Sequence, residues 1–266
     1  MTRRDFATAS ATTLAGLLTA RISFGAEAQN TGRAPSAGTA LIEDLVAANH
    51  ILADQGIVDG YGHVSVRHDR DPNRYLLSRD LAPALVAAED VMEYDLDSNP
   101  IDRKGRGMYQ ERFIHGEIYK ARPDVKAVVH NHSTNVIPFS VSSIRLQPVF
   151  HTAAFIVDGI PVFDASRFSG RHHAIVSNSE SGRELARMLG NKSAALILGH
   201  GAAVVGTSLP MAVGRSIYLD MSAKIQGQAI ALGGKVTALD PAAAREVSQN
   251  EYGRAWELWK KRVNTK

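Results

Sequence analysis

The stretch Ala121-Arg122-Pro123-Asp124-Val125-Lys126-Ala127-Val128-Val129-His130-Asn131-His132 joins the end of a helix to a strand that finishes in two histidines. The proline disfavours helical geometry in the residue before it, so the helix that we predict over 111–121 ends there. The β-branched run predicts a strand over 125–132. Side chains two positions apart in a strand share a face, so His130 and His132 project together. Such a pair suits a divalent metal, but a lone His-x-His also occurs as two polar residues at a strand end.

Two other segments carry residues that would complete a metal site. His200 lies between two glycines in the apolar segment 194–205, which we predict to be a strand interrupted by this Gly-His-Gly sequence. A polar ring there needs a partner, and the glycines let backbone or ligand come close. Glu111 and His115 share one face of the 111–121 helix, so either or both are candidates to reach the same metal. His115 alternatively orients Glu111, contacts substrate or lies on the helix surface.

The rest of the chain predicts a single α/β domain, without repeats or an internal linker. Mixed helices and strands of this kind build a sheet that is covered by helices. Tyr252, Trp256 and Trp259 follow helical spacing and predict a packing stripe rather than a site. Further helices are predicted over 41–56, 180–189, 209–232 and 241–263, and further strands over 64–67, 75–78 and 161–163.

Composition excludes several classes of protein. The 266 residues are 44% hydrophobic and 21% charged, which is the range of globular proteins and rules out wholesale disorder. The formal net charge of +3 contains no strong basic run, so no nucleic-acid partner is expected. The chain has no cysteine, which excludes disulfides, thiolate metal sites and cysteine nucleophiles. Any metal must therefore be held by histidine and carboxylate side chains.

The N-terminal residues have the order of features of an export signal. Arg3-Arg4, an apolar stretch over 7–20 and a small-residue site at 26–28 predict a twin-arginine signal peptide over 1–28. The alternative is a short tail with a chance Arg-Arg pair. Residues 29–38 are rich in small residues and predict a flexible lead-in.

The signal predicts export to the periplasm. Its apolar stretch is short and rich in Ala and Thr for a membrane span, so no stable membrane insertion is expected after cleavage. An uncleaved signal would instead remain as an anchor. Twin-arginine export carries folded proteins, which suits a protein that acquires a metal or assembles before it leaves the cytoplasm.

Four segments together resemble the class II aldolase/adducin family. The resemblance covers about residues 41–228 and implies, for a domain over 39–266, an α/β/α sandwich around a largely antiparallel sheet. Members are commonly cyclic tetramers with active sites between neighbouring subunits, so a homotetramer is expected. The segments, in family order, are Gly62-His63-Val64-Ser65-Val66-Arg67, Glu111-Arg112-Phe113-Ile114-His115, the stretch 121–132 and Leu198-Gly199-His200-Gly201.

The resemblance assigns a metal site. By motif, His130, His132 and His200 would be ligands, and Glu111 stands where these enzymes have a carboxylate that ligates the metal and acts as acid or base. One divalent ion per chain is expected, zinc first, with manganese, iron or cobalt as alternatives. Many adducin-like members lack these ligands and are not enzymes. This chain keeps them, which favours an enzyme over a non-catalytic interaction module.

The chain departs from the sugar-phosphate aldolases of the family in all three phosphate-binding elements. The elements read Gly62-His63-Val64-Ser65, Leu77-Ser78-Arg79-Asp80 and Tyr109-Gln110-Glu111, and the small donors that would hold a phosphate are largely gone. A phosphorylated sugar is therefore disfavoured as substrate.

Residues in and near these altered elements are the candidates for binding a small-molecule carboxylate. Arg79 and Arg112 could grip a carboxylate with their guanidinium groups, the alternative being surface salt bridges. His63 and Ser78 are predicted to contact substrate. His151 falls where related aldolases have a catalytic tyrosine that is donated across the subunit interface. A histidine there would still move a proton, the alternative being an ordinary polar loop residue.

The motif pattern is most similar to the decarboxylase branch of the family, which is associated with hydroxy-carboxymuconate semialdehydes and dihydroxyphthalate-type acids. Decarboxylation and retro-aldol cleavage both leave electrons that are held as an enolate, which a divalent cation stabilises. Glu111 or His151 would then protonate the carbon. The sequence therefore predicts a metal-dependent carbon–carbon lyase. A decarboxylase is the first interpretation, an aldolase on a non-phosphorylated substrate the second and an adducin-like binding module the third.

Overall fold

A single sheet is the centre of the computed structural model, which describes residues 36–168, 175–248 and 250–265. The strand order within these residues is β3-β2-β1-β4-β7-β6-β5. Every neighbouring pair is antiparallel except β5 with β6, so the predicted, largely antiparallel sheet is confirmed. The strands are β1 (His63–Arg67), β2 (Arg74–Ser78), β3 (Val91–Asp95), β4 (Ala127–Asn131), β5 (Val162–Phe163), β6 (Ala194–Ile197) and β7 (Gly201–Gly206).

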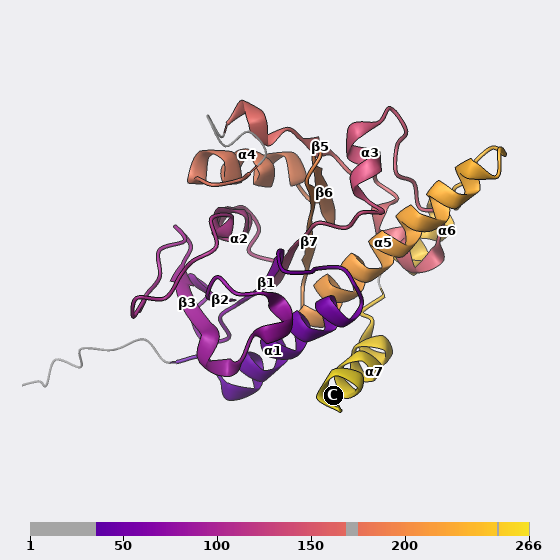
Figure 1. Ribbon diagram of the computed structural model, residues 1–266. Coiled ribbons are helices and arrows are strands. Elements are labelled where there is room, and N and C mark those ends of the chain that lie inside the picture. Colours follow the sequence, from indigo (N-terminus) through magenta and orange to yellow (C-terminus); the bar gives the residue numbers. More distant parts are fainter. Residues whose placement is uncertain (1–35, 169–174, 249, 266) are drawn as a thin grey trace, which may run out of the picture. The chain divides into compact units, whose positions relative to one another are not determined.

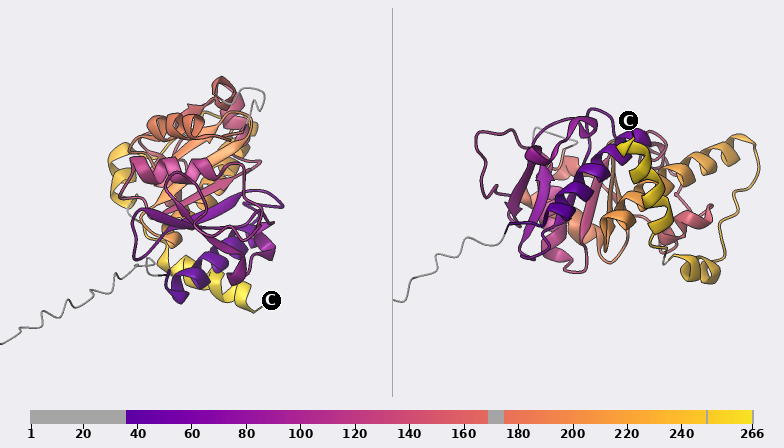
Figure 2. Two further views of the ribbon diagram at one scale, coloured as in Figure 1. Left: turned by 90° about the vertical axis from the view of Figure 1, so that its left-hand side faces the viewer. Right: turned by 90° about the horizontal axis from the view of Figure 1, so that it is seen from below.

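Helices cover both faces of the sheet, as the α/β/α sandwich requires. Helices α2 and α4 pack on one face, whereas α1, α5 and α7 pack on the other (Figure 1). Figure 2 shows α1 and α7 side by side, although they come from opposite ends of the described chain. The helices are α1 (Thr39–Asp54), α2 (Arg112–Ala121), α3 (Ile137–Val141), α4 (Ser179–Leu189), α5 (Leu209–Ala231), α6 (Pro241–Val247) and α7 (Gly253–Asn264), and 3-10 turns include η3 (His151–Ile156).

The predicted signal peptide over 1–28 and residues 29–35 of the predicted lead-in lie outside the described residues. Helix α1 begins at Thr39, which is where the lead-in was predicted to end. None of the helices in the described ranges has the length and apolar character needed to cross a membrane.

Strand β1 brings polar side chains under α2. Successive strand residues alternate between faces, so Val64 and Val66 join the apolar core on the α1 side of the sheet. His63 and Ser65 therefore face α2 and are buried. Strand β1 pairs with β4 so that His63 lies opposite His130. The sheet thus places a row of buried polar groups beside the first of the predicted metal ligands.

The Gly-His-Gly sequence is a turn, which corrects the prediction of one strand over 194–205. Strands β6 and β7 pair antiparallel from Ile197 with Gly201, so the three residues between them reverse the chain. Gly199 has a φ of +66°, which suits the left-handed position of a three-residue hairpin loop. His200 is the last residue of this loop and lies at the start of β7 rather than inside a strand.

The C-terminal segment forms two helices, which corrects the single helix predicted over 241–263. Helix α6 ends at Val247, and α7 begins after Tyr252, which has a φ of +58°. This backbone conformation lets the Tyr252 ring pack against Gly214 of α5, where an added Cβ would lie 2.5 Å from the ring. The Tyr252 hydroxyl donates to the Thr152 carbonyl at 2.7 Å. The predicted stripe is confirmed as packing, because Trp256 and the other two aromatic rings are buried.

Replacing Gly201 by alanine is expected to lower the free energy of unfolding by about 3 kcal/mol, the upper range for overpacking a core. A Cβ at this position would lie 1.9 Å from the Asn131 carbonyl oxygen, so β4 and β7 could not keep their pairing. Gly227→Ala in α5 is the matched control, since no atom lies within 4 Å of its added Cβ and alanine favours helix. Urea unfolding followed by circular dichroism measures both. Equal stability of the two variants would contradict the steric argument.

Candidate metal centre

Four side chains from three separate parts of the fold meet at the end of β4. Glu111 is the residue directly before α2, His130 lies in β4, His132 directly follows β4, and His200 ends the β6–β7 turn. Strand β4 lies between β1 and β7, so its end is adjacent to the start of β7. The sheet topology therefore brings together residues that lie far apart in the sequence.

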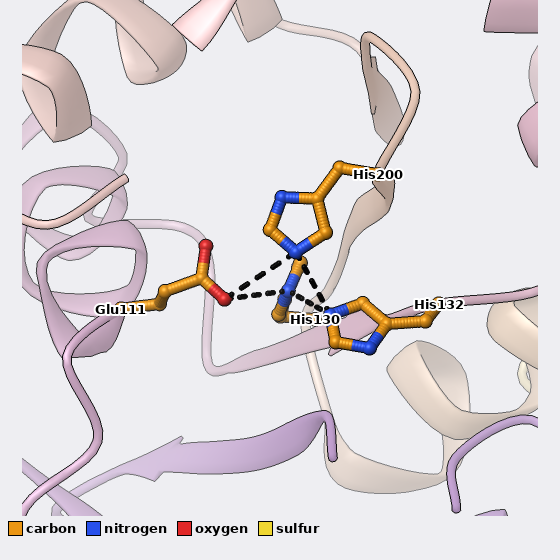
Figure 3. Close-up of side chains that lie close together, drawn as sticks. All are labelled: Glu111, His130, His132 and His200. Carbon is orange, nitrogen blue, oxygen red and sulfur yellow. Dashed lines mark hydrogen bonds and ion pairs between the residues drawn. The ribbon is translucent and has the colours of Figure 1, made fainter. Parts of the chain in front are cut away.

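The four groups converge on one point (Figure 3). The Nε2 atoms of His130 and His132 are 3.0 Å apart, and those of His132 and His200 are 2.9 Å apart. Glu111 Oε2 lies 3.2 Å from His130 Nε2 and 3.5 Å from His200 Nε2. The four ligand atoms all lie within 4.8 Å of one another. The structure thus brings together all the residues that were predicted as metal ligands.

The donor set fits a divalent cation. The Ala202 carbonyl can only accept, so His130 Nδ1–H donates to it at 3.2 Å and, in the neutral ring, leaves a lone pair on Nε2. That lone pair faces a nitrogen of His132 and a carboxylate oxygen. Three imidazole nitrogens and one carboxylate oxygen are a ligand set that zinc, manganese, iron and cobalt accept. A cation would turn repulsion between these electron-rich atoms into attraction.

The electrostatics of the cluster keep its groups in metal-binding form. Burial opposes ionisation of Glu111, but a protonated His130 ring, through its charge and hydrogen bond, outweighs it and lowers the pKa of Glu111 to about 2. Burial, with repulsion from His130 and His200, lowers the pKa of His132 to about 4. At neutral pH the cluster therefore offers a carboxylate and a neutral His132 ring, and these are the forms that bind metal.

Contacts outside the cluster hold its ligands in place. The backbone N–H of Val176 donates to Glu111 Oε1 at 3.2 Å, which leaves Oε2 for the cluster. The loop after His132 is fixed to α5, because Ser133 and Asn135 both donate to the Asp220 carboxylate. Sequence reasoning did not single out Asp220 or Val176, since they lie more than forty positions from the ligands that they support and follow no motif.

A cavity of about 230 Å³ opens beside the cluster. It is smaller than the roughly 300–1,000 Å³ typical of sites for drug-sized ligands, so it fits a small substrate. Its wall mixes aromatic, amide and carboxylate groups. The lining residues are Tyr61, Gly62, His63, Asp80, Tyr109, Gln110, Glu111, His132 and Ile175.

The two arginines predicted to grip a substrate carboxylate do not line this cavity. Arg79 forms an ion pair with Asp90, with Nε 2.6 Å from Oδ1. The Arg112 guanidinium donates to the backbone carbonyls of Ser98 and Tyr109 and lies over the Phe113 ring. Contacts within the chain thus engage both guanidinium groups and neither arginine lines the cavity, so their role in gripping a substrate carboxylate stays a prediction.

Of the other predicted substrate contacts, His63 lines the cavity and Ser78 does not. The Ser78 hydroxyl is fully buried against the Tyr109 hydroxyl, 3.1 Å away. The ring of His115 is also fully buried and bonds to His63 and Ser65 instead of reaching Glu111 or the cavity. Burial lowers the pKa of His115 to about 3 and that of His63 well below its ordinary value, so both rings are neutral.

His151, the predicted partner in proton transfer, is exposed at the start of η3 and does not line the cavity. A single chain therefore does not bring His151 to the cluster. The prediction that the residue is donated across a subunit interface stays a prediction.

The sandwich fold and the three-histidine, one-carboxylate cluster define a class of α/β protein with a candidate metal centre at one end of an antiparallel sheet. The chain belongs to the class II aldolase and adducin family, because the family model of the Class II Aldolase and Adducin N-terminal domain matches residues 43–227. The family predicted from the sequence motifs is confirmed.

Curated relatives include decarboxylases. The chain is 31% identical over 250 residues to decarboxylase tropJ of Talaromyces stipitatus, covering 84% of this chain and 94% of the relative. It is 28% identical over 222 residues to a 3,4-dihydroxyphthalate decarboxylase of Arthrobacter keyseri, covering 77% and 85%. Among solved structures, an L-fuculose 1-phosphate aldolase from Glaciozyma antarctica matches with a TM-score of 0.70 and 25% identity, covering 88% of this chain and 94% of the other. The predicted similarity to the decarboxylase branch is therefore confirmed.

Proposed function

We propose that this protein is a metal-dependent decarboxylase of a hydroxylated aromatic or muconate-type carboxylic acid. The observation that carries the proposal is the convergence of Glu111, His130, His132 and His200 beside a small cavity. The decarboxylases among its relatives support the type of reaction.

The cavity favours a flat, non-phosphorylated substrate. Tyr61 and Tyr109 offer aromatic surface, and Gln110 and His63 offer polar groups to substrate oxygens. With Arg79 held by Asp90, no arginine lines the cavity as the structure describes it. The altered phosphate elements of the sequence thus coincide with a wall that suits another kind of ligand.

The chemistry divides between the bound ion and the protein. A divalent cation held by the cluster would supply Lewis-acid stabilisation of negative charge on a substrate oxygen. In the reaction, the bond between the substrate carbon and its carboxylate breaks, carbon dioxide leaves and a proton from solvent takes its place. Glu111 starts ionised, so it serves as a ligand or a base and not as the initial acid.

The release of carbon dioxide tests the proposal. Zinc-loaded protein is incubated with 3,4-dihydroxyphthalate and related carboxylated aromatics and muconates. We expect one equivalent of carbon dioxide per product, loss of turnover with a chelator and recovery with zinc, manganese, iron or cobalt. Cleavage of a carbon–carbon bond without release of carbon dioxide would contradict the decarboxylase and favour an aldolase. An aldolase is the second candidate because one of the structural neighbours is an aldolase. If the protein neither binds metal nor turns over any substrate, the remaining interpretation is an adducin-like binding module.

We also propose a homotetramer whose sites lie between subunits, because His151 is exposed and remote from the cavity wall of its own chain. Light scattering measures the assembly. Mixed tetramers of His151→Ala and His200→Ala protein then test the shared site. If a neighbour donates His151, refolded equal mixtures of the two inactive variants recover about a quarter of wild-type activity, since about a quarter of the sites take His200 from one variant and His151 from the other. Mixtures without activity would contradict a shared site.

We further propose that the chain is exported through the twin-arginine route, on the basis of the sequence over 1–28. Replacing Arg3 and Arg4 by lysine is expected to keep the protein in the cytoplasm. Cell fractionation measures this, and an unchanged distribution would contradict the route.

A further inference from the structure

A chain of hydrogen bonds runs from beneath α2 to the cavity. His63 Nδ1 lies 2.7 Å from His115 Nε2, and His115 Nδ1 lies 2.6 Å from Ser65 Oγ. Ser65 Oγ lies 2.8 Å from the Tyr119 hydroxyl. All four side chains are buried, and only His63 lines the cavity. We call these four residues the buried hydrogen-bond chain.

The direction of these bonds follows from counting hydrogens. The Tyr119 hydroxyl has one hydrogen, and Ser65 Oγ is the only side-chain atom of the described residues with which it bonds. A buried hydroxyl without an acceptor costs about 1–3 kcal/mol, so Tyr119 donates to Ser65. The hydrogen of Ser65 then goes to its other neighbour, His115 Nδ1. His115 is neutral and carries its hydrogen on Nε2, which donates to His63 Nδ1.

The last hydrogen of the buried hydrogen-bond chain faces the cavity. With Nδ1 accepting from His115, the neutral His63 ring carries its hydrogen on Nε2. None of the described residues provides a hydrogen-bond partner for Nε2, and the ring lines the cavity with Glu111 and His132. Tyr109 and His130 pack on this ring, with centroids at 4.5 and 5.1 Å, and hold its orientation.

We propose that His63 is the substrate-orienting hydrogen-bond donor of this site, with Ser65, His115 and Tyr119 as positioning residues that fix its Nε2–H tautomer. The ligand class that it takes is a small molecule with an acceptor oxygen, from a carboxylate or a hydroxyl, beside the group that the metal centre holds. This inference rests on the proposed function for the identity of the ligand, but not for the tautomer. A fixed neutral donor binds an oxygen without placing a further charge beside the cation.

The tautomer is measured on substrate-free protein by two-dimensional 15N–1H spectra of histidine-labelled protein, with His63 assigned by its absence in His63→Asn. We expect the Nε2–H form alone in the wild type. Ser65→Ala removes the group that sets the direction, so His63 and His115 are expected to populate both tautomers. Ser222→Ala is the matched control, since Ser222 is equally buried and its hydroxyl has no partner among the described residues. A wild-type Nδ1–H tautomer, or no change in Ser65→Ala, would overturn the proposal.

Binding of 2,3-dihydroxybenzoate to zinc-loaded protein tests the donor itself. His63→Phe keeps an aromatic ring without the N–H and is expected to weaken binding about threefold to tenfold, the range for one neutral hydrogen bond. His63→Asn retains an amide donor and is expected to recover part of the affinity. Equal affinity of His63→Phe and the wild type would overturn the donor role. Because neither measurement follows turnover, a protein that fails to release carbon dioxide would refute the proposed reaction and leave this inference standing.

Discussion

Replacing His200 by alanine is expected to lower the affinity for zinc by more than about 100-fold and to abolish turnover. Loss of even an outer hydrogen-bond partner of a metal ligand typically costs about 10- to 100-fold in affinity, and this change removes a ligand. A metal ion that stabilises developing charge contributes several kcal/mol, so we expect at least about a thousand-fold decrease in kcat. Zinc content by mass spectrometry and carbon dioxide release measure the two effects.

His200 is the best of the three histidines for this test because replacing it leaves the packing of the core unchanged. His130 is fully buried in β4, where alanine would leave a hole, whereas His200 ends a turn and is partly exposed. The matched control is His50→Ala on α1, which also loses one histidine and one hydrogen bond, to the Val86 carbonyl at 2.9 Å. The control should bind zinc normally. Full zinc content in His200→Ala, with the fold intact by circular dichroism, would place the metal elsewhere or show that His200 is not a ligand.

The histidines were candidates because each stands at a position with a physical signature, and the resemblance to the class II aldolase/adducin family assigned them together with Glu111 as metal ligands. His130 and His132 follow a β-branched strand, and His200 stands between glycines that only a tight turn or a close approach would need. The turn itself was mistaken for an interruption within one strand, since apolar residues on both sides hide the reversal. The pattern of apolar residues in a strand does not show in which direction the strand runs, so the antiparallel pairing of β6 with β7 could not be predicted from it.

The partners of the two arginines predicted to bind substrate could not be predicted, because sequence does not show which groups an arginine meets in the fold. Asp90, which holds Arg79, lies in a 3-10 turn that no pattern marked. Strand β3, which follows it, was also missed. Its sequence Val91-Met92-Glu93-Tyr94-Asp95 alternates buried and half-buried residues, but two carboxylates lower the strand propensity. An edge strand tolerates them because one face remains accessible to water.

Only part of the buried hydrogen-bond chain could be predicted from the sequence. The alternation of Val64 and Val66 with polar neighbours marks β1 as a strand with one polar face. Nothing in the sequence said which helix covers that face. Tyr119 follows His115 by four positions and so shares its side of α2, but the contact of both with Ser65 depends on how α2 packs on the sheet.

Replacing Glu111 by glutamine is expected to reduce zinc affinity and kcat by about 100-fold or more while leaving the fold intact. The substitution removes the negative charge of the donor set, and a neutral amide oxygen is a much poorer partner for a divalent cation. The glutamine carbonyl can still accept the N–H of Val176, as Glu111 Oε1 does at 3.2 Å, so the local backbone keeps its support. Zinc titration and carbon dioxide release measure the effect.

The comparison with Glu111→Ala separates charge from position. Alanine removes the acceptor of the Val176 N–H as well as the charge, so it should match glutamine in zinc affinity but lose about 1 kcal/mol more stability in urea unfolding. Such a result would show that the charge of the carboxylate contributes to zinc binding and that its Oε1 atom, which accepts from Val176, contributes to the stability of the fold. If Glu111→Gln instead bound zinc like the wild type and lost only turnover, the carboxylate would act as a base beside a centre held by His130, His132 and His200. Its depressed pKa, about 2, means that the carboxylate is ionised when the substrate arrives, but it also makes Glu111 a weak base at neutral pH.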